Sequence, residues 1–127
     1  MNNISIKRVY ETPSPDDGLR ILVDRLWPRG MKKEDVQIDY WFKEVAPSNE
    51  LRKWFGHNPE HFEQFRESYL QELKTDARKR AIVDKLCELI MHQPTTLLFA
   101  AKDNRHNNAV VLKEEILRRL EGKGQNS

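Results

Sequence analysis

The chain has 127 residues, a length that fits one domain, and its 38% hydrophobic and 33% charged residues are typical of a folded, polar protein. Its 22 basic and 20 acidic residues leave a formal net charge of +2, which excludes a protein that attracts nucleic acid through an overall positive field but still allows a local basic patch. The single cysteine, Cys87, excludes an internal disulfide and favours a reducing compartment.

The start of the chain and its apolar stretches predict a cytoplasmic protein with no membrane partner. The first ten residues, MNNISIKRVY, lack the hydrophobic region of a signal peptide. The longest apolar stretch, LLFAA from Leu97, is far shorter than the roughly 20 residues that cross a bilayer as a helix.

Strand patterns dominate the first third of the sequence. Apolar residues at 4, 6 and 9 predict a first strand, and the turn-rich segment 12–18, TPSPDDG, follows it. Residues 19–27, LRILVDRLW, predict a second strand whose apolar, β-branched centre is typical of a sheet covered on both faces. Residues 28–37 are expected to form a loop with one short helix. Residues 38–47 fit either a strand or an irregular segment.

Helical patterns begin near residue 47. Ser48 is expected to cap a short helix that ends at Gly56. A second helix follows Asn58, with Pro59 at its first position, where a missing N–H group costs nothing. A third helix, capped at residue 75 or 76, carries apolar residues at helical spacing through 75–90.

The last elements complete an α/β pattern. Residues 95–101, TTLLFAA, predict a buried central strand, and residues 107–120 predict a helix with an apolar stripe. Because strands alternate with helices, we expect a small, largely parallel sheet flanked by amphipathic helices in a single domain, 1–121. Residues 122–127 are expected to form a flexible tail.

Two polar segments follow predicted strands and suggest a binding site. The first is DRLWPRG, residues 24–30, and the second is AKDNRHNNA, residues 101–109. Ligands of open α/β sheets bind beyond the carboxyl ends of the strands, and parallel strands bring both segments to the same edge. Arg25 and Arg29 would then face Asp103, together with the residues that follow it, across one crevice.

The residue types in these segments favour an anionic ligand that carries a carboxylate or a phosphate. The guanidinium groups of Arg25 and Arg29 can bind such a group bidentately, and the last helix, which begins near Asn107, can add free N–H groups. Trp27 would supply an apolar floor, and Trp54 could stack a flat ligand. The alternative is structural: the acid and the arginines pair locally, and both tryptophans belong to the core.

Four further side chains could move or orient a proton. Asp103 precedes His106 by three residues and could orient its ring, while His57 lies in a loop between two helices and could act as a general acid or base. Asp24 could orient these groups. The alternative is that Asp103 or Asn107 only caps the last helix and that His57 only links two helices.

Four long segments of the chain, between Ile6 and about Leu120, form one recognisable pattern: IKRVYE, DGLRILVDRLWPRG, WFKEVAPSNELRKWFGH and LLFAAKD with HNNAVVL. These segments resemble the bacterial proteins grouped as domain of unknown function 488, in particular the YeaO-like branch. The resemblance implies a compact cytoplasmic α/β domain without implying a particular activity. The motif residues carried over to this chain are Arg8, Asp24, Arg25, Trp27, Pro28, Arg29, Gly30, Trp54, Phe55, His57, Asp103 and Asn107. Longer relatives carry cysteines near the last strand, where this chain has Phe99, Ala100, Asn107 and Asn108, so thiol and metal chemistry is not transferred.

The favoured hypothesis is an anionic small-molecule site, with or without catalysis, at the carboxyl edge of the sheet. Arg25 and Arg29 would hold the anion with support from Arg8, and no cofactor or metal is expected. The alternative is a non-catalytic module that binds nucleic acid or protein through the basic segment 25–33, which also contains Lys32 and Lys33. A third reading gives the polar loops only a role in stability.

Overall fold

The computed structural model describes residues 3–125, with side chains described as far as Gly122. In chain order its strands and α-helices are β1 (Ile4–Arg8), β2 (Leu19–Leu22), α1 (Lys33–Val36), β3 (Tyr40–Trp41), α2 (Asn49–Phe55), α3 (Phe62–Thr75), α4 (Ala77–His92), β4 (Thr95–Phe99) and α5 (Asn108–Gln125). Short 3-10 turns occupy Pro15–Asp17, Lys43–Val45 and Pro59–His61. The last helix therefore extends beyond the expected end of the domain at residue 121, and residues 126–127 of the expected tail lie outside the described part.

The four described strands form one parallel sheet in the order β1-β4-β2-β3. The last strand in the sequence is thus a central strand, and Ile4 pairs with Thr95 while Ile21 pairs with Leu97. This confirms the predicted α/β class, the single domain and the parallel sheet. It also places the carboxyl ends of β2 and β4 next to each other.

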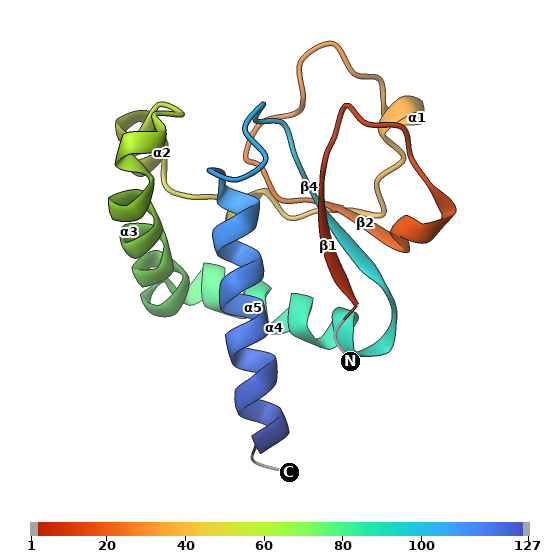
Figure 1. The fold of residues 1–127 in the computed structure, drawn as a ribbon. Coiled ribbons are helices and arrows are strands. Elements are labelled where there is room, and N and C mark those ends of the chain that lie inside the picture. Colours follow the sequence, from red (N-terminus) through yellow and green to blue (C-terminus); the bar gives the residue numbers. More distant parts are fainter. Residues whose placement is uncertain (1–2, 126–127) are drawn as a thin grey trace.

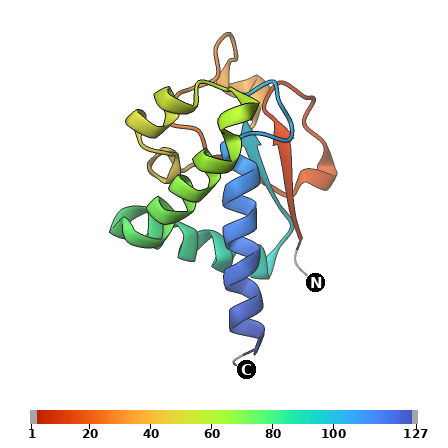
Figure 2. The same ribbon diagram turned by 60° about the vertical axis from the view of Figure 1, so that its left-hand side comes forward.

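The two faces of the sheet are covered differently (Figures 1 and 2). Helices α3, α4 and α5 cover one face, where Ile21, Leu97 and Phe99 belong to the main hydrophobic core. Helix α1 and neighbouring loops cover the other face, where Leu22 and Leu98 belong to a smaller apolar cluster. The central strands β2 and β4 are therefore largely buried, as predicted for β2, but the long helices flank only one face of the sheet.

Helix boundaries follow the expected capping residues. Ser48 Oγ accepts the N–H of Leu51 at 3.2 Å, and α2 ends at Gly56, which has a φ of 53°. Asn58 accepts the N–H of Glu60, and the 3-10 turn that begins there leads directly into α3. Of the two caps considered for α4, the structure uses Asp76, which accepts the N–H of Lys79.

Two strands end earlier than predicted because side chains take over their hydrogen bonds. The strand predicted for residues 19–27 ends at Leu22, and the one predicted for 95–101 ends at Phe99. The N–H of Ala100 donates to the carboxylate of Asp24, at 2.9 Å, instead of to a backbone carbonyl of the neighbouring strand. A short polar side chain thus replaces the β-ladder at this point.

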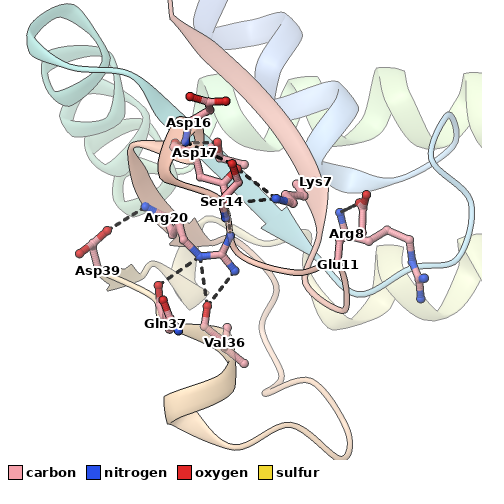
Figure 3. Close-up of polar contacts among 11 residues, drawn as sticks. Lys7, Arg8, Glu11, Ser14, Asp16, Asp17, Arg20, Val36, Gln37 and Asp39 are labelled. Atoms are coloured by element: carbon pink, nitrogen blue, oxygen red, sulfur yellow. Dashed lines mark hydrogen bonds and ion pairs between the residues drawn. The ribbon is translucent and has the colours of Figure 1, made fainter.

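A buried ion cluster stabilises the opposite, amino end of the sheet. The carboxylate of Asp17 accepts from Lys7 Nζ at 3.1 Å and from Arg20 Nη1 at 2.5 Å (Figure 3). The same Arg20 guanidinium also donates to the carbonyls of Val36 and Gln37. The cluster therefore joins β1, β2 and the end of α1.

Candidate functional site

The two polar loops predicted to meet at the carboxyl edge of the sheet do lie together. Asp24, directly after β2, receives the Ala100 N–H from the loop after β4. Its second oxygen accepts from Asn108 Nδ2, at 3.0 Å, in the first turn of α5. Asn108 also donates to the carbonyl of Val23, at 3.2 Å. Asp24 is therefore a link between three segments that surround the site.

A pocket of about 670 Å³ opens at this edge. The loops after β2 and β4 and helix α2, which bound it, all lie at the same end of the molecule in Figure 1. Its lining consists of Tyr10, Asp24, Arg25, Leu26, Trp27, Pro28, Arg29, Ala46, Pro47, Arg52, Phe55, His57, Phe65, Ala100, Ala101, Lys102, Asp103, Asn107 and Asn108. The size is within the range of pockets that bind small organic molecules.

Four cationic side chains line this pocket. They are Arg25, Arg29, Arg52 and Lys102. Among residues 3–125, none of the four forms an ion pair or donates a side-chain hydrogen bond. By contrast, Arg20 forms an ion pair with Asp17, and Arg119 forms one with Glu115. The Nε atom of Arg25 is buried and has no hydrogen-bond partner in the described structure. A buried donor without a partner is costly, and Arg25 is one of the residues that line the pocket.

The two acids of the pocket are already engaged. Burial raises the pKa of the Asp24 carboxyl above its usual value, although hydrogen bonds from Ala100 and Asn108 and the nearby His57 oppose the rise. The N–H groups of Arg105 and His106 bind Asp103 Oδ1 and, with the His106 ring, hold the pKa of that carboxyl below its usual value. Both carboxylates bind groups of the surrounding loops and of α5, so neither forms an ion pair with a lining cation.

His57 lines the pocket from the connection between α2 and the next turn. It is exposed and has a φ of 60°, directly after Gly56 in the same left-handed region. A non-glycine residue rarely adopts this conformation, and such positions occur often at functional sites. The structure thus brings His57 to the predicted crevice, while its predicted role in proton transfer stays a prediction.

His106 and Asn107 have different surroundings. His106 Nδ1 lies 2.8 Å from Asp103 Oδ2, and its ring packs edge-on against Phe62, but it is not among the lining residues. The buried Asn107 accepts the Val110 N–H and donates to the Asp103 carbonyl, so its amide forms the cap of α5. Asp103 therefore orients the imidazole as expected, and the capping alternative applies to Asn107.

The remaining predicted ligand contacts separate into two groups. Trp27 lines the pocket, with its Nε1 donating to the Met31 carbonyl and its ring packed edge-on against Trp41. Arg8 is not a lining residue: its guanidinium donates to the carbonyls of Ala100 and Ala101, and it lies 5.1 Å from the ring centre of Tyr10. Trp54 is exposed and stacks on His61 outside the pocket.

Two lining cations were not singled out from the sequence. Lys102 lies inside the polar segment that follows β4, so its place in the chain was a usable signal. Arg52 lies in α2, and no local pattern indicates that this helix packs beside the sheet edge. Phe55 and Phe65 form an apolar wall of the pocket, and neither was predicted to contact a ligand.

The lining limits the chemistry that the pocket can perform. None of the lining residues identified in the described chain is a serine, a threonine or a cysteine. Between residues 3 and 125, no three His, Cys, Asp or Glu side chains lie close enough together to hold a metal ion. The groups suited to ligand contact are cationic, aromatic and aliphatic.

No helix in the described part of the chain has both the length and the apolar composition needed to cross a membrane.

Comparison with known proteins identifies the family. The chain is 47% identical over 112 residues to the uncharacterized protein YeaO of Escherichia coli K12, an alignment that covers 88% of this chain and 95% of that protein. It is 41% identical over 111 residues to the uncharacterized protein Rv3073c of Mycobacterium tuberculosis H37Rv, covering 87% and 91% of the two chains. No solved structure matches it. The family model described as the inactive DUF488-N3 subclade, DUF488-N3i, matches residues 3–127, and the chain belongs to this family.

Proposed function

We propose that the protein binds an anionic small molecule, bearing a phosphate or a carboxylate, in the pocket at the carboxyl edge of the sheet. The observation that carries this proposal is the Arg25 side chain, which lines the pocket, forms no ion pair in the described structure and has a buried Nε without a hydrogen-bond partner there. Guanidinium groups bind oxyanions bidentately through two of their nitrogens.

The charge balance supports an anion over a neutral ligand. Arg29, Arg52 and Lys102 join Arg25 on the pocket wall, and the structure gives none of them an acidic partner among residues 3–125. Like charges in one concavity repel each other, and a bound anion relieves this repulsion. Each charge-assisted hydrogen bond contributes about 1.5–3 kcal/mol, so a contact by one guanidinium changes affinity by roughly tenfold or more.

The lining favours binding without turnover. Covalent catalysis needs an activated hydroxyl, thiol, amine or carboxylate, and the lining offers no hydroxyl or thiol apart from the Tyr10 phenol, which donates to the Arg29 carbonyl at 3.0 Å. Asp24 is held by Ala100 and Asn108. The family description, which calls the subclade inactive, agrees with this reading. His57, the Lys102 amine and the Asp103–His106 pair are the groups through which a catalytic role would have to act.

The test is a titration with inorganic phosphate followed by calorimetry and by thermal unfolding, at constant ionic strength. Phosphate at tenfold its dissociation constant should stabilise the protein by about 1.4 kcal/mol, equivalent to a rise of roughly 3–6 °C in Tm. Arg25→Gln and Arg29→Gln should each weaken binding about tenfold or more. The matched control is Arg105→Gln, which removes the same charge from an exposed residue outside the pocket. Equal effects of all three substitutions would overturn the proposal.

Salt dependence and one further variant separate this function from nucleic-acid binding through residues 25–33. Contact with six backbone phosphates would weaken binding about a thousandfold between 50 and 200 mM salt, whereas a single bound anion responds far less. Lys32 and Lys33 lie outside the pocket lining. Lys32→Gln should therefore leave phosphate affinity unchanged, and a loss of oligonucleotide binding in this variant would favour the alternative.

A further inference from the structure

The pocket is much larger and more apolar than a bare oxyanion requires. A volume of about 670 Å³ is in the range of pockets that enclose whole organic ligands of roughly 300–1,000 Å³. Four cations account for one part of the wall, while aromatic and aliphatic side chains form much of the rest. An inorganic phosphate would leave these apolar groups in contact with water, and a larger ligand would cover them.

The apolar part of the wall begins in the core of the protein. Phe55 and Phe65 both line the pocket, both are almost fully buried, and their rings stack with centres 4.3 Å apart. They belong to the main hydrophobic core beneath α2 and α3. This part of the pocket is therefore fixed before any ligand arrives.

Tyr10 forms a second fixed aromatic surface. Its hydroxyl donates to the Arg29 carbonyl at 3.0 Å, and the guanidinium of Arg8 lies 5.1 Å from its ring centre. Arg8 is held in turn by the Ala101 carbonyl, at 2.9 Å. The tyrosine ring is thus fixed beside one of the unpaired arginines, and Arg8 acts as its support.

Leu26 extends the apolar surface to the rim. It lies between Arg25 and Trp27 in sequence, lines the pocket, and has 62% of its surface exposed. A leucine at this position contributes nothing to the binding of an inorganic anion. It becomes favourable when the body of a ligand covers it, because burial of apolar surface is the main driving force for binding organic groups.

We infer that the ligand is an organic phosphate with an aromatic body, in which Arg25 and Arg29 hold the phosphate while Tyr10, Leu26 and Phe55 contact the ring. This inference rests on the proposed function and names the class of ligand for the same pocket. Aromatic rings favour stacked and edge-on contacts with other aromatic rings, which a sugar or an aliphatic chain does not provide to the same extent. An aryl phosphate has both features that the lining favours, a negative charge for the arginines and an aromatic ring for the apolar wall.

Calorimetry with three probes tests this inference: inorganic phosphate, ribose 5-phosphate and phenyl phosphate, each at the same ionic strength. Phenyl phosphate should bind at least tenfold more tightly than either of the others. Leu26→Ser should weaken phenyl phosphate about fivefold and leave inorganic phosphate unchanged, because only the ring contacts this side chain. The matched control, Met91→Ser, alters a residue of α4 that is also 62% exposed and lies outside the pocket, and should change neither affinity.

The outcomes separate the two proposals. If ribose 5-phosphate or inorganic phosphate binds as tightly as phenyl phosphate, the aromatic class is wrong while the anion site stands. If Leu26→Ser and Met91→Ser have the same effect on phenyl phosphate, the aromatic class is likewise wrong. If none of the three probes binds to the folded wild-type protein, a phosphate site in this pocket is refuted, and the ligand class with it.

Discussion

The buried ion cluster at the amino end of the sheet gives a direct test of what stabilises this fold. The carboxylate of Asp17 binds both Lys7 and Arg20 and also accepts the N–H of Ser14, at 2.9 Å. The side chains of Asp17 and Arg20 are only 9% and 6% exposed. Asp17→Asn removes the charge while keeping the shape, so two cations lose their counter-ion in a poorly solvated place.

The expected loss follows from this burial. Removing one partner of a buried ion pair costs about 3–5 kcal/mol, because the remaining charge is left uncompensated. Arg20 keeps its bonds to the carbonyls of Val36 and Gln37, and Lys7, whose side chain is 18% exposed, can reach water. We therefore expect the lower end of the range, about 3 kcal/mol. With a urea m-value of about 1.5 kcal/mol/M, the midpoint of unfolding should fall by roughly 2 M.

Urea denaturation followed by circular dichroism measures this change. The control is Arg78→Gln, which breaks an ion pair with Glu44 in which the arginine side chain is 72% exposed, and should cost less than about 1 kcal/mol. The reasoning is refuted if the two variants lose the same stability. Phosphate affinity should be unchanged in Asp17→Asn, since the cluster and the pocket lie at opposite ends of the strands.

Two further predictions concern backbone packing and pH. Gly18 has a φ of 64°, and an added Cβ would lie 2.1 Å from the Pro94 carbonyl oxygen. Gly18→Ala should therefore lower the free energy of unfolding by about 2–4 kcal/mol. A loss below about 1 kcal/mol would show that the turn can shift to make room for the methyl group. Burial raises the pKa of Glu115, but hydrogen bonds from Arg118 and Arg119 outweigh it and hold the pKa below its usual value of 4.5. The ionised Glu115 carboxylate therefore adds its full contribution to the free energy of unfolding above about pH 4.5, and this contribution is lost as the pH falls through the folded pKa. Between pH 6 and pH 3, the free energy of unfolding should fall less steeply in Glu115→Gln than in the wild type. Equal slopes would contradict this assignment.

The sequence predicted the class of the fold because its strongest signals are local. The side chains of Ser48 and Asp76 cap the starts of helices, and Gly56 ends a helix in a left-handed backbone conformation that glycine adopts easily. The order of the strands and the uneven coverage of the two sheet faces depend on contacts between distant residues, so local patterns did not contain them. The lengths of β2 and β4 were overestimated because the Asp24 side chain, and not the backbone, binds Ala100.

The candidate site could be predicted where it follows directly from strand ends. Arg25, Arg29 and Asp103 lie just after β2 and β4, so a rule about parallel sheets was sufficient to bring them together. Arg52 joins them from a helix whose position depends on packing against α3, and this packing has no signature in the sequence around it. Arg8 is the last residue of β1, which pairs with β4, but hydrogen bonds to backbone carbonyls hold its side chain outside the pocket lining.

The central place of β4 has a consequence for how the protein is made. Strands β1 and β2 are not neighbours in the sheet, and each pairs with β4, which begins at Thr95. During synthesis, Ile21 and Leu22 can pair with β3 early, but their second partner strand, β4, leaves the ribosome much later. Nascent chains with such exposed apolar segments are prone to aggregate, so the emerging chain should depend on chaperones until its last quarter has been translated.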